Sequence, residues 1–184
     1  MFTGIIEQIA EVVELKKEGS NVHFLLKSSI TKELKIDQSV AHNGVCLTVV
    51  DINDDIYTVT AINETLNKSN LGHLGIGSKV NMERCIKMGA RVDGHMVQGH
   101  VDQTAICTDV KEDNGSHIFT FEYEESDKII AEKGSVCVNG VSLTVVNSKD
   151  NAFSVAIIPY TFKHTNFHAL RVGTVVNIEF DILG

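Results

Sequence analysis

Short runs of apolar residues that partly alternate with polar ones follow one another along the whole chain. They are rich in Val, Ile and Thr and are separated by Gly, Asn, Asp or Ser, which is typical of β-strands joined by turns. In the first half these runs cover residues 5–15, 21–28, 39–52, 56–62 and 79–86. Short helices are predicted at residues 30–35, 63–72, 125–133 and 160–169. The pattern therefore predicts an all-β protein with a few short helices.

The second half of the chain repeats the first. SVAHNGVCLTVVD at residues 39–51 returns as SVCVNGVSLTVVN at residues 135–147, at an offset of 96 residues. The same offset carries residues 57–86 onto residues 153–182 without a gap. A period this long that occurs only twice is typical of duplicated domains and not of a solenoid.

The front of each copy matches as well. MFTGIIEQ at residues 1–8 corresponds to MVQGHVDQ at residues 96–103, with an offset one residue shorter. We therefore expect an N-terminal domain at residues 1–87, a C-terminal domain at residues 96–184 and a connector at residues 88–95. Five or more strands in about 90 residues favour a small closed antiparallel barrel, because closure removes exposed sheet edges. The expected fold is two tandem homologous β-barrels.

Composition narrows the classes of function. The chain of 184 residues is 43% hydrophobic and carries a net charge of −8, which argues against nucleic acid as a partner because such partners require a basic face. No basic region precedes a long apolar stretch, so we expect neither a signal peptide nor a membrane span, and a cytoplasmic location. The four cysteines are widely spaced without a CxxC pair, so neither a metal site nor a disulfide framework is expected.

Differences between the copies fall inside their best-matched motif. NGVCLTV carries Cys46 where NGVSLTV carries Ser142, and the alternation of a strand places Thr48 and Thr144 on the same faces as these residues. The preceding Asn-Gly favours a tight hairpin turn with positive φ, so a site built here would be rigid. The simpler interpretation is a hairpin whose threonines satisfy local hydrogen bonds.

Two further differences add candidate chemistry. Asp181 stands in the second copy where the first has Cys85, and His100 stands opposite Ile5. A solvated strand end is the simpler interpretation of Asp181. His95 and His100 are five residues apart, which does not fit the helical zinc pair, so a proton-handling or hydrogen-bonding role is favoured for the histidines.

The segments MFTGIIE, SVAHNGVCLTV, NETL with SNLG, GHMVQGHVD and KGSVCVNGVSLTV together resemble the riboflavin synthase family from end to end. The resemblance implies two Greek-key barrels, each binding one 6,7-dimethyl-8-ribityllumazine. It also implies that two lumazines are dismutated, by transfer of a four-carbon unit, to riboflavin and 5-amino-6-ribitylamino-2,4-pyrimidinedione. No metal or organic cofactor is implied.

The resemblance also implies which residues contact the substrate. Strand backbone groups are expected to bind the pyrimidine edge, and hydroxyls and carboxylates such as Glu64 the ribityl chain. In the first barrel the family's motifs fall on Gly4, Ile5, Ile6, Cys46, Leu47, Thr48, Thr60, Ala61, Ile62, Asn63, Glu64 and Thr65. In the second barrel they fall on Gly99, His100, Val101, Lys133, Ser142, Leu143, Thr144, Ala156, Ile157, Ile158, Pro159, Tyr160 and Thr161.

Four of these positions are candidate catalytic residues. Ser142, polarised by Asp181, is expected to activate the group that adds to the donor lumazine. Cys46 is expected to act as a nucleophile or as a polar contact, and His100 to shuttle protons. The family implies a homotrimer assembled by a C-terminal helix, whereas no helix-length amphipathic segment follows Asp181 in DILG.

Three other functions remain to be separated from this one. A non-catalytic lumazine- or flavin-binding fluorescent protein shares the two barrels, but such a protein is expected to lose the paired catalytic groups. A flavoprotein reductase requires a nucleotide-binding βαβ domain with a glycine-rich phosphate loop, which the sequence does not contain. A purely structural tandem barrel leaves the differences between the copies unexplained. Riboflavin formation from the lumazine distinguishes the enzyme from all three.

Overall fold

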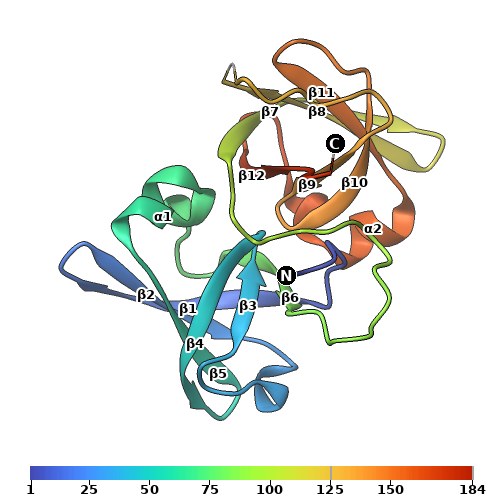
Figure 1. The fold of residues 1–184 in the computed structure, drawn as a ribbon. Coiled ribbons are helices and arrows are strands. Elements are labelled where there is room, and N and C mark those ends of the chain that lie inside the picture. Colours follow the sequence, from blue (N-terminus) through green and yellow to red (C-terminus); the bar gives the residue numbers. More distant parts are fainter. Residues whose placement is uncertain (125, 184) are drawn as a thin grey trace.

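The computed structural model describes residues 1–124 and 126–183 and consists of two closed antiparallel barrels (Figure 1). The first barrel contains β1 (Gln8–Glu18), β2 (Asn21–Lys27), β3 (Ser39–His42), β4 (Val45–Asn53), β5 (Ile56–Ala61) and β6 (Lys79–Arg84). The second contains β7 (Gln103–Asp113), β8 (Ser116–Tyr123), β9 (Ser135–Val138), β10 (Val141–Val146), β11 (Ala152–Ile157) and β12 (Val175–Phe180).

Strand order is the same in both barrels. Around the first barrel the order is β1-β2-β5-β4-β3-β6, and around the second it is β7-β8-β11-β10-β9-β12, with every neighbouring pair antiparallel. Each strand of the second barrel thus occupies the place of its counterpart six strands earlier. The predicted all-β fold of two tandem Greek-key barrels is confirmed.

The short helices agree only in part with the prediction. After β5 the chain forms α1 (Asn63–Lys68) and the 3-10 helix η2 (Asn70–His73), and after β11 it forms α2 (Pro159–His164) and η3 (Asn166–Ala169), as expected. In the predicted segment 30–35 only the single turn η1 (Thr31–Glu33) is helical, and it is a 3-10 turn.

The helix predicted at residues 125–133 is wrong. Residue 125 lies outside the described residues, and residues 126–133 form bends, turns and irregular chain. Ile130 is buried in the second core whereas its neighbour Ile129 is 86% exposed, and Lys133 has a φ of 64°. Packing of one isoleucine into the barrel and a left-handed residue at the end of the segment therefore outweigh its helix propensity.

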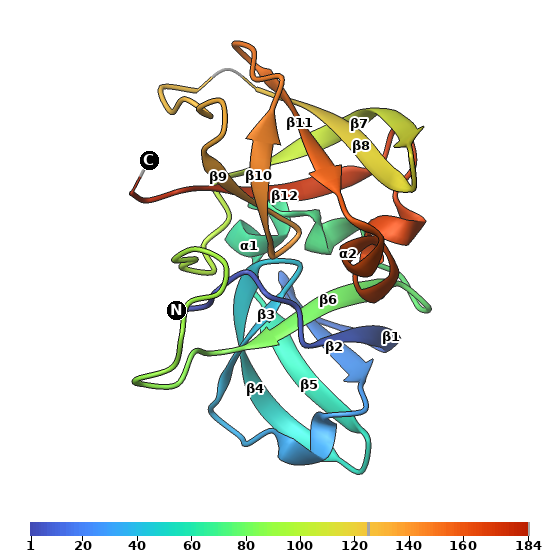
Figure 2. The same cartoon turned by 90° about the vertical axis from the view of Figure 1, so that its right-hand side faces the viewer.

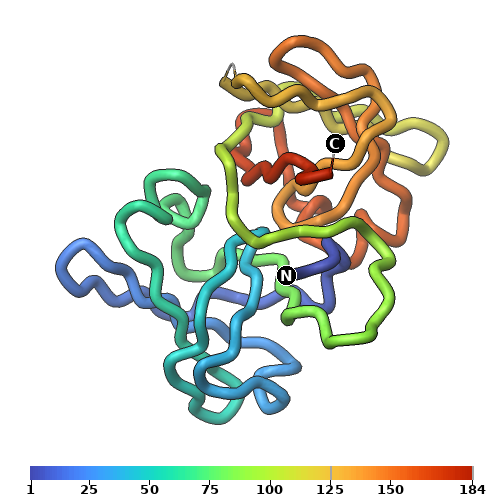
Figure 3. The backbone as a smooth tube through the Cα atoms, in the orientation of Figure 1, coloured from blue at the N-terminus to red at the C-terminus, as the bar shows by residue number. Residues whose placement is uncertain are grey.

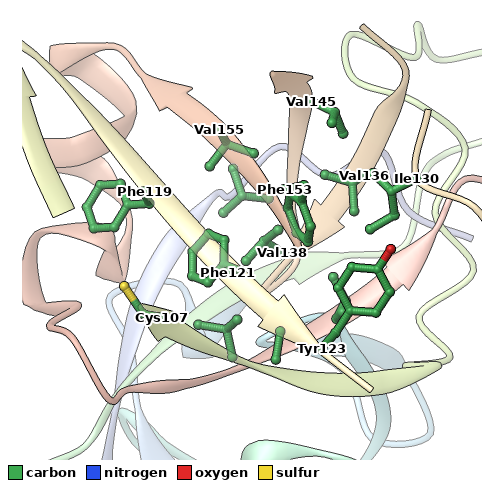
Figure 4. Close-up of a cluster of buried hydrophobic side chains, with 14 of the residues drawn as sticks. Cys107, Phe119, Phe121, Tyr123, Ile130, Val136, Val138, Val145, Phe153 and Val155 are labelled. Atoms are coloured by element: carbon green, nitrogen blue, oxygen red, sulfur yellow. The ribbon is translucent and has the colours of Figure 1, made fainter. Parts of the chain in front are cut away.

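Each barrel encloses its own core. The second core is strongly aromatic and includes Phe119, Phe121 and Phe153, which lie together with branched aliphatic side chains inside the barrel (Figure 4). The first core contains instead a polar pair, in which His42 Nε2 and Tyr57 Oη are hydrogen-bonded at 2.8 Å.

The polar pair in the first core is fully enclosed. His42 and Tyr57 are 1% and 0% exposed, and His42 Nδ1 has no hydrogen-bond partner among the described residues. Burial disfavours the charged imidazolium and lowers the pKa of His42 to about 4. The repeat places Val138 and Phe153 at the corresponding positions of the second barrel, so this pair is specific to the first barrel.

The two barrels meet at their Asn-Gly turns. Asn43 and Gly44 have φ values of 47° and 81°, and Asn139 and Gly140 have 47° and 78°, so both turns are of the predicted positive-φ kind. A Cβ on Gly140 would lie 2.7 Å from the backbone nitrogen of Gly44, so the two turns are in direct backbone contact.

Six buried asparagines surround this contact and follow the repeat. Asn81 Nδ2 donates to the Asn139 carbonyl and to Asn166 Oδ1, and Asn177 Nδ2 donates to the Asn43 carbonyl and to Asn70 Oδ1, all at 2.9 Å. Because buried amides are costly unless they are hydrogen-bonded, this network holds the barrels in one relative orientation.

We expect Gly140→Ala to destabilise the protein by about 2 kcal/mol more than Gly115→Ala, because it adds steric overlap to backbone strain. Gly115 is a matched control: it also follows an asparagine and has a φ of 88°, but a Cβ there would meet nothing within 4 Å. Urea unfolding of both variants measures the difference. Equal losses would show that the Gly44–Gly140 contact tolerates a methyl group.

Candidate functional site

The first barrel is incomplete at one end of the β4–β5 pair. These strands pair from Val49 opposite Val59 onward, whereas residues 45–48 of β4 pair with β3 alone in the described chain. Thr60 and Ala61 of β5 likewise pair with β2 and not with β4. Two strand ends therefore lie in one barrel wall without hydrogen bonds to each other, a region that we call the first opening (residues 45–48 and 60–61).

The second barrel repeats this feature. β10 and β11 pair at Val145 with Val155 and at Val146 with Ser154. Residues 141–144 pair with β9, and Ala156 and Ile157 with β8, in the part of the chain that the structure describes. We call this region the second opening (residues 141–144 and 156–157).

The candidate side chains lie on the outer faces of these strand ends. In β4 the half-buried Cys46 and the exposed Thr48 alternate with the buried Val45 and Leu47. In β10 Ser142 is half-buried and Thr144 is exposed. The predicted pairs therefore do share a face, whereas Leu47 points toward the core and offers a ligand only its backbone.

The N-terminal segment of each copy of the repeat borders the opening of the other copy's barrel. The Ser142 N–H donates to the Gly4 carbonyl at 2.8 Å, and the Cys46 N–H donates to the Gly99 carbonyl at 2.8 Å. Ile6 packs against the core of the second barrel and Val101 against that of the first. We call residues 1–6 the first crossing segment and residues 96–101 the second; the former is the blue chain that passes between the barrels in Figure 2.

This exchange corrects the grouping expected from the sequence. Residues 4–6 were grouped with Cys46, and residues 99–101 with Ser142, because each lies in the same copy of the repeat. The structure places each with the other barrel. The repeat shows that the crossing segments are equivalent, but which barrel they contact depends on how the barrels pack, which no local pattern records.

Exposed apolar side chains gather around both openings. Ile62 follows the first opening and is 54% exposed, and Ile158 and Tyr160 follow the second at 58% and 69%. Ile5, on the first crossing segment, is also exposed. Exposed apolar side chains beside a strand edge suit contact with the apolar face of a ligand.

Ser142 is hydrogen-bonded to a histidine. His95 Nδ1 lies 2.6 Å from Ser142 Oγ, and the backbone N–H of His95 donates to the Thr3 carbonyl at 3.1 Å. Burial lowers the pKa of His95, and the negative charge of Asp181 opposes that shift. A neutral imidazole with its proton on Nε2 can accept the Ser142 hydroxyl proton at Nδ1, which is the arrangement of a nucleophile and its base.

Asp181 acts on Ser142 at most through this histidine. Asp181 Oδ1 accepts a hydrogen bond from the Leu183 N–H at 3.0 Å, and among the described residues no hydrogen bond joins Asp181 to Ser142. Gly94 is required beside the pair, because a Cβ there would lie 2.0 Å from the Thr3 carbonyl oxygen and 2.8 Å from Ser142 Cβ. The sequence marks His95 as a candidate for hydrogen bonding, but its pairing with Ser142 spans 47 residues and has no local signal.

Cys46 lies in a different environment. Burial raises the pKa of its thiol, and a hydrogen bond with Ser39 only partly opposes this shift. A neutral thiol is a weak nucleophile. The environment therefore favours the polar-contact interpretation of Cys46 over the nucleophile interpretation.

The remaining predicted residues lie at the rims of the openings. The ring of His100 is exposed, and Lys133 is held beside β10 by its N–H, which donates to the Val145 carbonyl at 3.0 Å. The Thr60 hydroxyl is hydrogen-bonded to His23 Nδ1 at 2.8 Å, and Glu64 to Lys68 at 2.9 Å. Asn63 and Thr65 lie in α1, and Pro159 and Thr161 in α2, so these residues flank the openings.

Two clefts do not coincide with the openings. One, of about 510 Å³, lies between the β1–β2 hairpin and the α1–η2 segment, and another, of about 860 Å³, borders Thr3, Ile5 and Cys85.

Within residues 1–124 and 126–183 no cluster of His, Cys, Asp or Glu could hold a metal ion, and no helix is long and apolar enough to cross a membrane. The connector forms a loop beside the N-terminus (Figure 3), to which it is joined by the hydrogen bond from the His95 backbone N–H to the Thr3 carbonyl.

Comparison with known proteins finds the same two domains. The lumazine binding domain family matches residues 3–85 and again residues 98–181. The riboflavin synthase of Bacillus subtilis (strain 168) is 38% identical and is matched over 100% of this chain and 86% of its own length. That of Mycobacterium tuberculosis (strain CDC 1551 / Oshkosh) is 39% identical over 100% of this chain and 94% of its own length.

Solved structures share the fold. LumP complexed with riboflavin aligns with a TM-score of 0.90 at 21% identity, over 97% of this chain and 98% of LumP. LumP complexed with 6,7-dimethyl-8-(1'-D-ribityl) lumazine aligns with a TM-score of 0.89. At this identity the likeness concerns the fold alone. The sequence relatives decide the family: this chain, with its two lumazine binding domains, belongs to the riboflavin synthases and is an enzyme of the transferase class.

Proposed function

We propose that this protein converts two molecules of 6,7-dimethyl-8-ribityllumazine to riboflavin and 5-amino-6-ribitylamino-2,4-pyrimidinedione, with one lumazine bound at each opening. The observation that carries the proposal is that two equivalent openings differ in chemistry: the first presents Cys46, and the second presents Ser142 hydrogen-bonded to His95. Equivalent sites suit one ligand bound twice, and different side chains suit its two roles as donor and acceptor.

Binding uses the strand edges that lack a neighbouring strand at the openings. The Cys46 N–H points away from β3 toward Gly99, so the alternation of a strand turns the N–H and carbonyl of Thr48 to the same edge. Ser142 and Thr144 form the same edge in the second opening. A pyrimidine ring, which alternates donors and acceptors, matches such an edge, and residues 62–65 and 158–161 offer polar groups to the ribityl chains.

The four-carbon transfer needs positioning and proton management. The donor lumazine loses carbons 6 and 7 with their methyl groups, and the acceptor gains them as the new ring of riboflavin, so the atoms of two lumazines divide between two products without an external oxidant or reductant. His95 takes the Ser142 proton while Ser142, or a water activated by it, adds to carbon 7 of the donor. The acceptor's 7-methyl proton is acidic because the ring delocalises the carbanion, and His100 lies at the rim to receive it.

Incubation with 6,7-dimethyl-8-ribityllumazine tests this function. We expect riboflavin absorbance to rise with time and one riboflavin to form for every two lumazines consumed. Stable lumazine fluorescence without riboflavin formation would overturn the proposed reaction in favour of a binding protein. The absence of any binding would overturn the assignment of the openings as ligand sites.

Assembly and location remain predictions. The homotrimer implied by the resemblance would bring the first opening of one chain to the second opening of another. Sedimentation equilibrium of the purified protein, with and without riboflavin, measures whether three chains associate.

A further inference from the structure

Each crossing segment is held by a buried carboxylate. Glu83 on β6 is 5% exposed and accepts hydrogen bonds from Thr3 N–H at 2.8 Å, from the Thr3 hydroxyl at 2.6 Å and from Gly4 N–H at 3.1 Å. Burial raises the pKa of Glu83, and these hydrogen bonds oppose that shift. Glu83 therefore acts as the acceptor for successive backbone groups of the first crossing segment.

The repeat supplies the same arrangement for the second crossing segment. Glu179 on β12 is 6% exposed and accepts from Gln98 N–H at 2.6 Å, Gly99 N–H at 3.0 Å and His100 N–H at 2.9 Å. Burial likewise raises its pKa, against the effect of these hydrogen bonds. Neither carboxylate is paired with a cation in the described chain, so their partners are backbone groups and one hydroxyl.

Each carboxylate lies in one barrel, and the crossing segment that it holds borders the opening of the other barrel. Glu83 belongs to the first barrel, but the segment it holds presents the Gly4 carbonyl to Ser142 of the second. Glu179 belongs to the second barrel, but its segment presents the Gly99 carbonyl to Cys46 of the first.

Little displacement of either segment is tolerated. A Cβ on Gly4 would lie 2.5 Å from Ser142 Cβ, and one on Gly99 would lie 2.8 Å from Cys46 Cβ. The two segments are also joined to each other, because Phe2 N–H donates to the Val97 carbonyl at 2.7 Å and Val97 N–H to the Phe2 carbonyl at 3.1 Å. Each carboxylate therefore holds a crossing segment whose glycine is packed directly against Ser142 or Cys46.

We propose that Glu179 and Glu83 are positioning residues that act across the two barrels: Glu179 shapes the first opening, and Glu83 shapes the second. The proposal rests on the proposed function, in which both openings bind lumazine and riboflavin. It implies that each ligand site of the chain depends on a carboxylate that belongs to the opposite copy of the repeat.

Glutamine variants isolate this role. Glutamine has nearly the same shape but offers one oxygen, and its NH₂ group would face a backbone donor, so at least one buried N–H loses its acceptor in either orientation. Because Thr48 and Thr144 are exposed at the openings, Thr48→Arg and Thr144→Arg serve to block the first and the second opening respectively. In the protein with one opening blocked, riboflavin binding then reports on the other opening alone; we call these two proteins the blocked backgrounds.

The expected result is a crossed pattern in riboflavin fluorescence titrations. With the second opening blocked, Glu179→Gln weakens binding about tenfold and Glu83→Gln changes it less than twofold. With the first opening blocked, the effects of the two variants are reversed. Glu11→Gln, which removes an exposed carboxylate paired with Lys79, changes neither background.

Loss of binding in the carboxylate's own barrel, or equal loss at both openings, would overturn the positioning role, because a general loss of stability gives those patterns. If neither blocked background binds riboflavin before a glutamate is changed, the proposed ligand sites fail instead.

Amide hydrogen exchange gives a second measurement that requires no ligand. In Glu179→Gln we expect the Cys46 amide to exchange faster and the Ser142 amide to be unchanged, and exchange that rises at Ser142 instead would contradict the proposal.

Discussion

Replacement of Ser142 by alanine is expected to lower the turnover number on 6,7-dimethyl-8-ribityllumazine about 100-fold or more, with riboflavin affinity changed less than about threefold. The hydroxyl is hydrogen-bonded to His95 at 2.6 Å, so its loss removes the proposed proton relay, whereas the backbone edge of β10 that we propose as the ring site stays in place. Single-turnover formation of riboflavin measures the chemical step, and equilibrium titration measures binding. Unchanged turnover would remove Ser142 from the chemistry.

Cys46→Ser is the matched control for this experiment. It changes the corresponding residue of the other barrel, whose half-buried thiol has a raised pKa and is neutral at pH 7. We expect turnover within a few-fold of the unchanged protein. A loss as large as that of Ser142→Ala would restore Cys46 as the nucleophile and reverse the roles of the two openings.

The lowered pKa of His95 predicts how turnover depends on pH. Burial lowers its pKa, so the neutral imidazole that accepts the Ser142 proton persists below the usual histidine range. We expect the acid limb of the turnover profile to lie below pH 6.5, the ordinary histidine value. Asp181→Asn removes the charge that opposes the shift and should move this limb to still lower pH. A limb that does not move would remove Asp181 from the relay.

The second large effect concerns stability, and its source is His42. Its pKa falls from 6.5 in the unfolded chain to about 4 in the folded protein, so between these values the unfolded chain binds a proton that the folded protein does not. The contribution of His42 to the free energy of unfolding is therefore fully present above pH 6.5 and is lost as the pH falls toward 4. At pH 4 the loss from this group alone reaches about 3 kcal/mol.

The second barrel supplies the variant that tests this prediction. His42→Val with Tyr57→Phe introduces the residues that stand at the same positions of the repeat, Val138 and Phe153, and should remove that part of the slope. Urea unfolding at pH 7 and pH 4, compared between the double variant and the unchanged protein, measures it. Parallel stability curves would contradict the assignment. His42→Val alone is a poorer test, because it leaves the buried Tyr57 hydroxyl without its partner.

Patterns in the sequence were sufficient to predict the two tandem barrels. The offset between NGVCLTV and NGVSLTV revealed the duplication, and Asn-Gly at residues 43–44 and 139–140 predicted turns that both adopt positive φ. Turn chemistry and strand alternation act over a few residues, so a local pattern records them. For the same reason the prediction that Cys46 and Thr48 share one face of a strand is confirmed, and the structure shows that this is the outer face.

Features that depend on contacts between distant residues were not predicted. The helix expected at residues 125–133 is absent from the described part of that segment, because Ile130 enters the second core. His95 becomes the partner of Ser142 only because the connector returns to β10.

The repeat in the sequence shows that the chain contains two copies of one barrel and that Cys46 and Ser142 occupy the same place in each. The completion of each opening by a segment from the other copy, through Gly4 and Gly99, is seen only in the folded chain. The physical reason is the range of the interactions. Strand alternation and turns are set by neighbouring residues, whereas the exchange depends on hydrogen bonds between the two copies, from the Ser142 N–H to the Gly4 carbonyl and from the Cys46 N–H to the Gly99 carbonyl, that form once the barrels pack together.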